Sequence, residues 1–415
     1  MSTNRQEPAN SAGGANPYRP VQALKERLQA IRTCLQASGT PKQNGVDDLA
    51  TLFALRAICA GRVDQPDPWI TAQTKKRWGS MLESSGRDRV RHFNELISFL
   101  ATNAELPVSR CFRGYAPNAA PDVMAYSIAL ADQVTFDGIH DTIIARIYEE
   151  VIESDSVDLV SRNHLVHTPA SIAHTLARVA NIGPDERVVV QESGPGNLFG
   201  AVLRTTASLR GNSALESGQM FGIIDRASNQ RIAAIFTLLL ESRAISGVLR
   251  PRSQSAQNSS VNTNVMVADL SGPNPLVEAA SMITPGGRGA MVVDDTALSL
   301  DAAIHGELDH FLSLCEPTVL LRLPIGAFHI RRKRRTLLLF NKRPQVSVAR
   351  AGPGPWCFDL RSNMPDFGRE NPFPIQAFKT FEMSFEGGQL VEARATRSGR
   401  WTRISSTSLL LGRLG

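Results

Sequence analysis

The stretch at residues 187–199, RVVVQESGPGNLF, decides the fold of this chain. It joins a short run of valines to a turn that contains Gly194 and Gly196, and then to an apolar segment that begins at Leu198. A short apolar strand, a glycine turn and a helix, in this order, are typical of parallel sheets covered by helices on both faces. Because such sheets bind ligands beyond the carboxyl ends of their strands, the turn marks an expected ligand site.

Five further apolar runs repeat this pattern toward the C-terminus. They lie at residues 221–225, 265–269, 289–293, 319–323 and 336–340, and helical stretches at residues 171–180 and 229–241 separate several of them. Alternating strands and helices predict a mostly parallel sheet. We therefore expect a Rossmann-like α/β domain at residues 156–345, followed by a loop-rich C-terminal extension at residues 346–415.

The first part of the chain has a different periodicity. Apolar residues recur at three- and four-residue steps, for example within residues 24–35 and 93–100. This spacing places the apolar side chains on one face of a helix, and it predicts an all-helical N-terminal domain at residues 21–155. Residues 1–20 are rich in Asn, Gly, Ser, Pro and Ala, and we expect them to form a disordered arm.

The composition is that of an ordinary globular protein. The 415 residues are 42% hydrophobic and 20% charged, and the formal net charge is +6. A modest basic excess fits a polyanion partner such as DNA, although many basic proteins bind no nucleic acid. The five cysteines are scattered, which argues against a metal site or a disulfide framework and favours a cytoplasmic setting. No apolar run reaches the roughly 18 residues that a membrane helix needs.

Several segments between about residues 135 and 385 occur in a recognisable order. They are residues 147–150 (IYEE), 167–169 (HTP), 194–196 (GPG), 283–290 (ITPGGRGA), 323–328 (LPIGAF) with 336–340 (TLLLF), and 356–361 (WCFDLR) with 364–368 (MPDFG). Together they resemble the methylation subunit of type I restriction-modification systems, an N6-adenine DNA methyltransferase family. The resemblance implies the fold of S-adenosylmethionine (SAM)-dependent methyltransferases, SAM as cofactor, and DNA together with a specificity or restriction subunit as partners.

The resemblance also implies a role for individual residues. Asp269, at the end of the predicted strand 265–269, would accept a hydrogen bond from the target adenine amine as the catalytic residue. Asp225 would bind the ribose hydroxyls of SAM. The residues implied to hold the cofactor are His167, Thr168, Pro169, Gly194, Gly196 and Asp225.

The chain departs from the family pattern at three places. Val190 and Gln191 stand where the family has an Asp-Pro pair, and Ile224 stands where it has the ribose acid, with Asp225 one residue late. No Pro-Pro-aromatic sequence follows Asp269, so the ring that would stack on a flipped base is missing. These departures favour a pseudoenzyme with lost or impaired catalysis. The alternative is an active but divergent SAM-dependent DNA methyltransferase, and a glycine turn or a loop after a core strand also explains these segments without any ligand.

A run of basic residues precedes the last predicted strand. It consists of Arg331, Arg332, Lys333, Arg334 and Arg335. Consecutive positive charges can neutralise DNA phosphates, so we predict a nucleic-acid-binding segment here. A solvated charged loop is the alternative. A protein that binds DNA through this loop alone, with no methyltransferase activity, is a third hypothesis.

Overall fold

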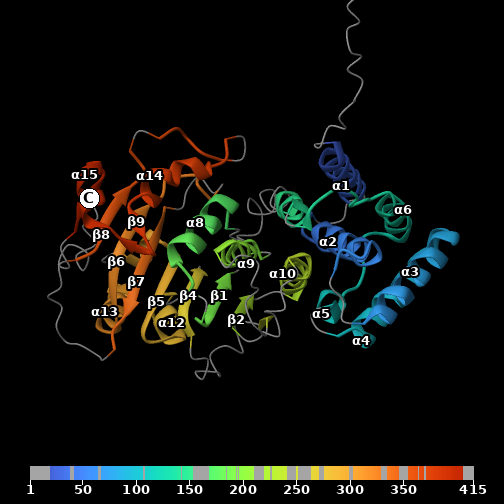
Figure 1. The fold of residues 1–415 in the computed structure, drawn as a ribbon, viewed down its shortest axis with the longest axis horizontal. Coiled ribbons are helices and arrows are strands. Elements are labelled where there is room, and N and C mark those ends of the chain that lie inside the picture. Colours follow the sequence, from blue (N-terminus) through green and yellow to red (C-terminus); the bar gives the residue numbers. More distant parts are fainter. Residues whose placement is uncertain are drawn as a thin grey trace, which may run out of the picture.

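The structure is a computed structural model, and it divides the chain into a helical region and an α/β region (Figure 1). The described residues are 19–37, 42–63, 67–105, 108–141, 143–152, 168–183, 185–192, 194, 196–209, 219–224, 227–240, 249–250, 263–270, 275–298, 302–328, 334–344, 354–362, 364–368 and 371–404. Most of the arm expected at residues 1–20 lies outside them, and the first helix begins at Arg19. Within the described residues, no helix combines the length and the apolar character that crossing a membrane requires.

The helical region is built from amphipathic helices that share one apolar core. The helices are α1 (Arg19–Ala37), α2 (Lys42–Cys59), α3 (Pro68–Glu83), α4 (Gly86–Asn103), α5 (Val108–Phe112) and α6 (Pro121–Asp132), and residues 143–152 are also helical. The apolar residues spaced three and four apart in α1 and α4 are buried, as their periodicity predicts. Helix α3 begins at Pro68 because the side chain of Asp67 accepts a hydrogen bond of 2.8 Å from the backbone N–H of Trp69.

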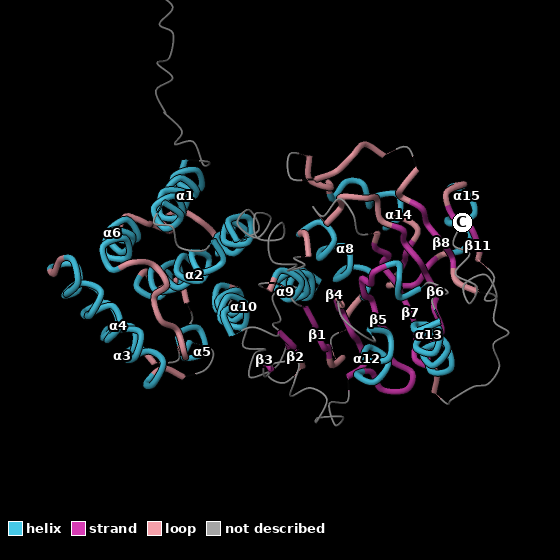
Figure 2. Tube along the Cα trace, turned by 180° about the vertical axis from the view of Figure 1, so that it is seen from behind, coloured by secondary structure: helices cyan, strands magenta, loops and turns pink. Residues whose placement is uncertain are grey.

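Helix α10 (Ala227–Leu239) joins the two regions. Both views place it between the helical region and the sheet (Figures 1 and 2). Most of its buried apolar residues, including Ile235 and Phe236, belong to the core of the helical region, whereas Ala233 packs into the α/β core. A buried ion pair between Arg231 of α10 and Asp47 of α2 adds a polar contact across this boundary.

The α/β region contains a nine-stranded sheet with the order β11-β8-β6-β7-β5-β4-β1-β2-β3. Strands β7 and β11 pair antiparallel with their neighbours, and the other pairs are parallel. The strands are β1 (Val188–Glu192), β2 (Met220–Ile224), β3 (Leu249–Arg250), β4 (Thr263–Asp269), β5 (Ile283–Asp294), β6 (Cys315–Arg322), β7 (Arg335–Lys342), β8 (Trp356–Asp359) and β11 (Trp401–Arg403).

Helices cover both faces of the sheet. Helices α8 (Ala170–Ala180) and α9 (Asn197–Leu209) pack on one face, and α12 (Pro275–Met282) and α13 (Ala302–Leu314) pack on the other. Alternate residues of each strand enter the two cores, so that Val188 and Val190 face α8 and α9 while Val189 faces the opposite way. The central strands are therefore buried on both sides, which explains their nearly continuous apolar runs.

The C-terminal part of the chain extends the sheet. Strands β8 and β11 add to its edge next to β6. In the core there, the rings of Phe381 and Trp401 stack, and Phe358 contacts both of them edge-on. The short elements are η1 (Asp295–Leu298), η2 (Ile375–Phe378), α14 (Lys379–Glu382), α15 (Glu392–Ser398) and the hairpin of β9 (Phe385–Glu386) and β10 (Gln389–Leu390). The predicted α/β sandwich with a helical N-terminal region is confirmed, and all six predicted strands are present; β3, β8 and β11 were not predicted.

Candidate functional site

Charged side chains form a row along the carboxyl ends of the central strands. Asp294 ends β5 and lies in register beside Arg335, which begins the antiparallel strand β7. Arg322 ends β6, and its guanidinium lies 3.5 Å from the carboxylate of Asp359 at the end of β8. Because ligands bind at this edge in open α/β sheets, the row and the adjoining ends of β1, β2 and β4 are the candidate site.

Asp269, the predicted catalytic residue, is buried at the end of β4. It is 2% exposed. Its Oδ2 accepts a hydrogen bond of 2.6 Å from the Thr168 hydroxyl, and its Oδ1 accepts one of 2.7 Å from Arg335 Nη1. Thr168 precedes Pro169, the N-cap residue of α8, so this bond ties the start of α8 to the sheet. The structure thus brings two predicted site residues into contact with each other, and both oxygens of Asp269 already have donors.

Arg335 corrects the prediction that the whole basic run faces nucleic acid. Its side chain is 1% exposed, and its Nε lies 2.9 Å from Asp294 Oδ1. The guanidinium carbon also lies 4.5 Å from the centre of the Phe328 ring. A guanidinium that is buried and paired with carboxylates cannot neutralise a phosphate. Arg334 is exposed, whereas residues 331–333 lie outside the described residues.

Glu192 is a site residue that the sequence analysis missed. It ends β1, is 2% exposed, and its carboxylate accepts hydrogen bonds of 3.3 and 3.0 Å from the backbone N–H groups of Leu198 and Phe199. These donors belong to the first turn of α9, so Glu192 stabilises the start of that helix. Burial raises the pKa of Glu192 to about 7, and the charge of nearby Asp269 adds to the rise. An acid directly before a glycine turn was the available sequence signal.

The glycine turn is required by close packing. Gly196 has φ +104°, and a Cβ placed there would lie 2.9 Å from the Cα of Ala233 in α10. Only glycine combines this backbone conformation with so short an approach. Gly194 is also buried. The described geometry therefore explains Gly196 by helix packing, without reference to a cofactor.

Other predicted positions have a structural role or lie outside the described residues. Val190 is a fully buried core residue, and the Gln191 side chain donates a 2.7 Å hydrogen bond to a glutamate of α12. Ile224, at the end of β2, is also fully buried in the apolar core. Asp225 and His167 lie outside the described residues. The described end of β2 therefore presents an apolar residue where the family pattern has an acid.

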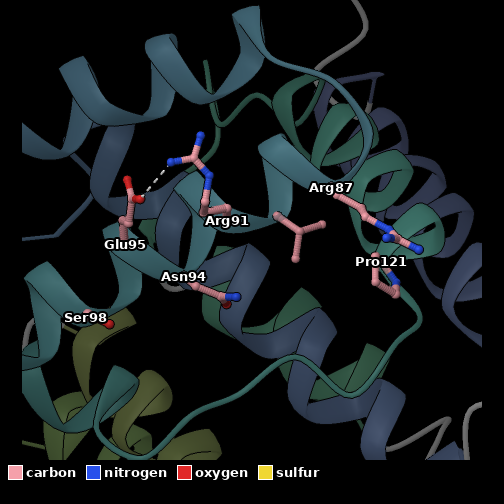
Figure 3. A pocket seen from close by; sticks show the side chains of 7 residues that line it. Arg87, Arg91, Asn94, Glu95, Ser98 and Pro121 are labelled. Carbon is pink, nitrogen blue, oxygen red and sulfur yellow. Dashed lines mark hydrogen bonds and ion pairs between the residues drawn. The ribbon is translucent and has the colours of Figure 1, made fainter.

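Two cavities lie away from this edge. A shallow hollow of about 630 Å³ lies on the outer face of α4 (Figure 3). It is lined by Arg87, Val90, Arg91, Asn94, Glu95, Ser98 and Pro121. A second cavity, of about 290 Å³, lies between the end of α8, the β9–β10 hairpin and the opposite edge of the sheet. Neither is lined by Asp269, Glu192 or Arg335.

The chain is similar in fold and in sequence to known proteins. No protein-family model matches the chain. A class I SAM-dependent methyltransferase from Listeria monocytogenes superposes with a TM-score of 0.50 at 13% identity, over 83% of this chain and 94% of that chain. The type I restriction-modification methyltransferase subunit from Streptococcus thermophilus gives a TM-score of 0.67 at 11% identity, over 89% of this chain and 94% of that chain. In sequence, the methylase subunit of the type I restriction enzyme StySJI from Salmonella typhimurium is 22% identical over 403 residues, covering 86% of this chain and 75% of that protein.

The fold is therefore that of a SAM-dependent methyltransferase with an added helical region. In sequence and in fold the chain is similar to the methylation subunits of type I restriction-modification systems, and the resemblance carried by its motifs is confirmed.

The described side chains fit SAM poorly. A ribose needs a carboxylate at the end of β2, where the described residue is the buried Ile224. The carboxylates at the described ends of β1 and β4 belong to Glu192 and Asp269, and both are buried and already accept internal hydrogen bonds. Within the described part of the chain, no acid at these three strand ends is open to a cofactor.

Proposed function

We propose that this protein is a methyltransferase-like subunit of the type I restriction-modification kind, which binds DNA or a partner subunit without transferring methyl groups. The observation that supports this proposal is the pairing of Asp269 with Thr168 and Arg335. Transfer to an adenine amine needs a carboxylate or amide oxygen that the amine can reach and donate to. Asp269 is 2% exposed, and its two oxygens accept hydrogen bonds from Thr168 and Arg335, so a flipped base would have to reach a buried carboxylate that already has a counter-ion.

The charge of Arg335 also opposes the reaction. Positive charge develops on the amine nitrogen as it attacks a methyl group, and a preorganised carboxylate would stabilise that charge. Here the guanidinium of Arg335 lies 2.7 Å from Asp269 and neutralises the carboxylate. Because this pair lies in the low-dielectric interior, the guanidinium would in addition repel the developing ammonium.

A methyl-transfer assay tests the proposal. The purified protein, alone and together with a specificity subunit, is incubated with unmethylated DNA and SAM carrying a labelled methyl group. We expect no label in the DNA above the protein-free background, while a catalytically active type I methylase assayed in parallel labels its substrate. Label incorporation that depends on this protein, and that is lost in Asp269→Ala, would contradict the proposal.

An active, divergent methyltransferase is the second candidate, and the presence of both the Thr168-Pro169 pair and the glycine turn in the sequence favours it. In that case Gly194 and Gly196 would approach SAM, and Asp225 would bind its ribose. Calorimetric titration of the protein with SAM separates the two candidates. Heat of binding that disappears in Asp225→Ala would support the second candidate, and its absence at millimolar SAM would exclude it.

DNA binding through the basic residues that precede Arg335 belongs to the same proposal. The residues concerned are Arg331, Arg332, Lys333 and Arg334. Replacing all four with glutamine while keeping Arg335 should weaken DNA retention and reduce the slope of log affinity against log salt by about 3–4, if each side chain contacts one phosphate. An unchanged slope would assign the run to a solvated loop.

A further inference from the structure

Arg335 fills a space that has the properties of a cation-binding site. Its Nη1 and Nε lie 2.7 and 2.9 Å from carboxylate oxygens of Asp269 and Asp294, respectively. The guanidinium carbon lies 4.5 Å from the centre of the Phe328 ring. Two carboxylates and an aromatic ring around a planar cation are the usual partners of a recognised guanidinium group.

Arg335 and its hydrogen-bonded partners link four elements of the fold. Asp269 belongs to β4, Asp294 to β5 and Arg335 to β7. Thr168 extends the connection to α8, because its hydroxyl donates to the second oxygen of Asp269. The side chain of Arg335 therefore holds together, from inside, the strand ends between which ligands bind in open α/β sheets.

We propose that Arg335 acts as an internal ligand: its guanidinium permanently occupies a cation site formed by Asp269, Asp294 and Phe328, and this site takes a free guanidinium ion once the arginine side chain is removed. The consequence is a methyltransferase fold whose ligand edge is closed and stable without a cofactor. The inference rests on the proposed function, because an edge closed by Arg335 cannot receive an adenine amine.

Because Asp269 is buried, the stability of the site depends on the cation that pairs with it. Asp269 is 2% exposed, so without Arg335 its charge would lose its counter-ion in an apolar environment. Asp294 keeps 24% of its side chain exposed and can be hydrated. The Nε and one Nη atom of Arg335 are buried without a hydrogen-bond partner, so the contact of Nε with Asp294 is an ion pair and not a well-directed hydrogen bond. A free guanidinium ion, which rotates independently of the backbone, can satisfy the same carboxylates.

Thermal unfolding of Arg335→Ala in the full-length protein tests this inference. We expect its melting temperature to fall by about 10 °C. Millimolar guanidinium chloride should restore at least half of that loss, whereas sodium chloride at the same concentration should not. The matched control is Arg361→Ala, which removes a partly exposed arginine paired with Asp359. This variant should lose at most a few degrees and should not respond to guanidinium.

If Arg335→Ala is too unstable for a melting curve, its soluble yield after refolding replaces the melting temperature. A higher yield in guanidinium chloride than in sodium chloride supports the internal ligand, and equal yields overturn it. A guanidinium response of the same size in Arg361→Ala would overturn it too. Methyl transfer by the wild-type protein would instead refute the proposed function, so the two failures are distinguishable.

Discussion

Replacing Glu192 with glutamine should change how the stability of the protein depends on pH. The pKa of Glu192 is raised from 4.5 to about 7, first because the carboxyl is buried and second because Asp269 is near. The folded state therefore holds the proton more tightly than the unfolded state. Stability contributed by protonated Glu192 is fully present below pH 4.5 and is lost as the pH rises to about 7.

The size of this effect follows from the pKa shift. A rise from 4.5 to about 7 corresponds to about 3 kcal/mol of stability lost between those pH values. Glutamine is never ionised, and its carbonyl can still accept one of the hydrogen bonds from Leu198 or Phe199. We expect Glu192→Gln to be less stable than the wild type at pH 4.5, by about 1 kcal/mol for the lost acceptor. Above pH 7 the order should reverse, with the variant more stable by about 2 kcal/mol.

Urea unfolding of both proteins at closely spaced pH values measures the effect. The quantity of interest is the difference between the two free energies of unfolding, because other titrating groups, such as the buried Asp47 and Asp48, affect both proteins alike. A difference that stays constant between pH 4.5 and 8 would refute the reasoning. It would mean that Glu192 is hydrated, or that its charge is compensated, in the folded protein.

Two further variants test the packing around the site and between the regions. Gly196→Ala should destabilise the protein by about 2–4 kcal/mol, because its Cβ would meet the Ala233 backbone at a positive φ. The matched control is Gly79→Ala, in the interior of α3 with open space around it. This control should stabilise the protein slightly, and the melting temperatures of both variants measure the effects. Arg231→Met should cost about 3–5 kcal/mol in urea unfolding by leaving Asp47 buried without its counter-ion. The second change Asp47→Leu should recover most of this loss, and a double variant no more stable than the single one would contradict that account.

Much of the fold could be predicted because strands that are buried on both faces are continuous apolar runs in the sequence. Strands β1, β4 and β7 are nearly uninterrupted apolar runs between polar segments, and such runs were found. Strand β3 has only two residues, and β8 and β11 have four and three. Segments this short carry no periodicity and become strands only because a neighbouring edge is available to them.

The site was less accessible to sequence reasoning, for physical reasons. The family pattern has its acid at the position of Val190, whereas the acid that accepts hydrogen bonds from the residues after the glycine turn is Glu192. Arg335 is the last of five basic residues, and a charge run does not reveal which member enters the next strand. Its burial depends on Asp269 and Asp294, which are 66 and 41 residues away in sequence but adjacent at the edge of the sheet.

The position of α10 has a consequence for dividing this protein into parts. The helix is encoded within the α/β region, yet Ile232, Ile235, Phe236 and Leu239 are buried among residues of the helical region. A fragment that begins at residue 168 would expose these apolar side chains of α10 to water. A fragment that ends before α10 would leave the apolar core of the N-terminal helices uncovered on one side. Within the described residues, separating α10 from the helical region would therefore leave both parts with an exposed apolar face.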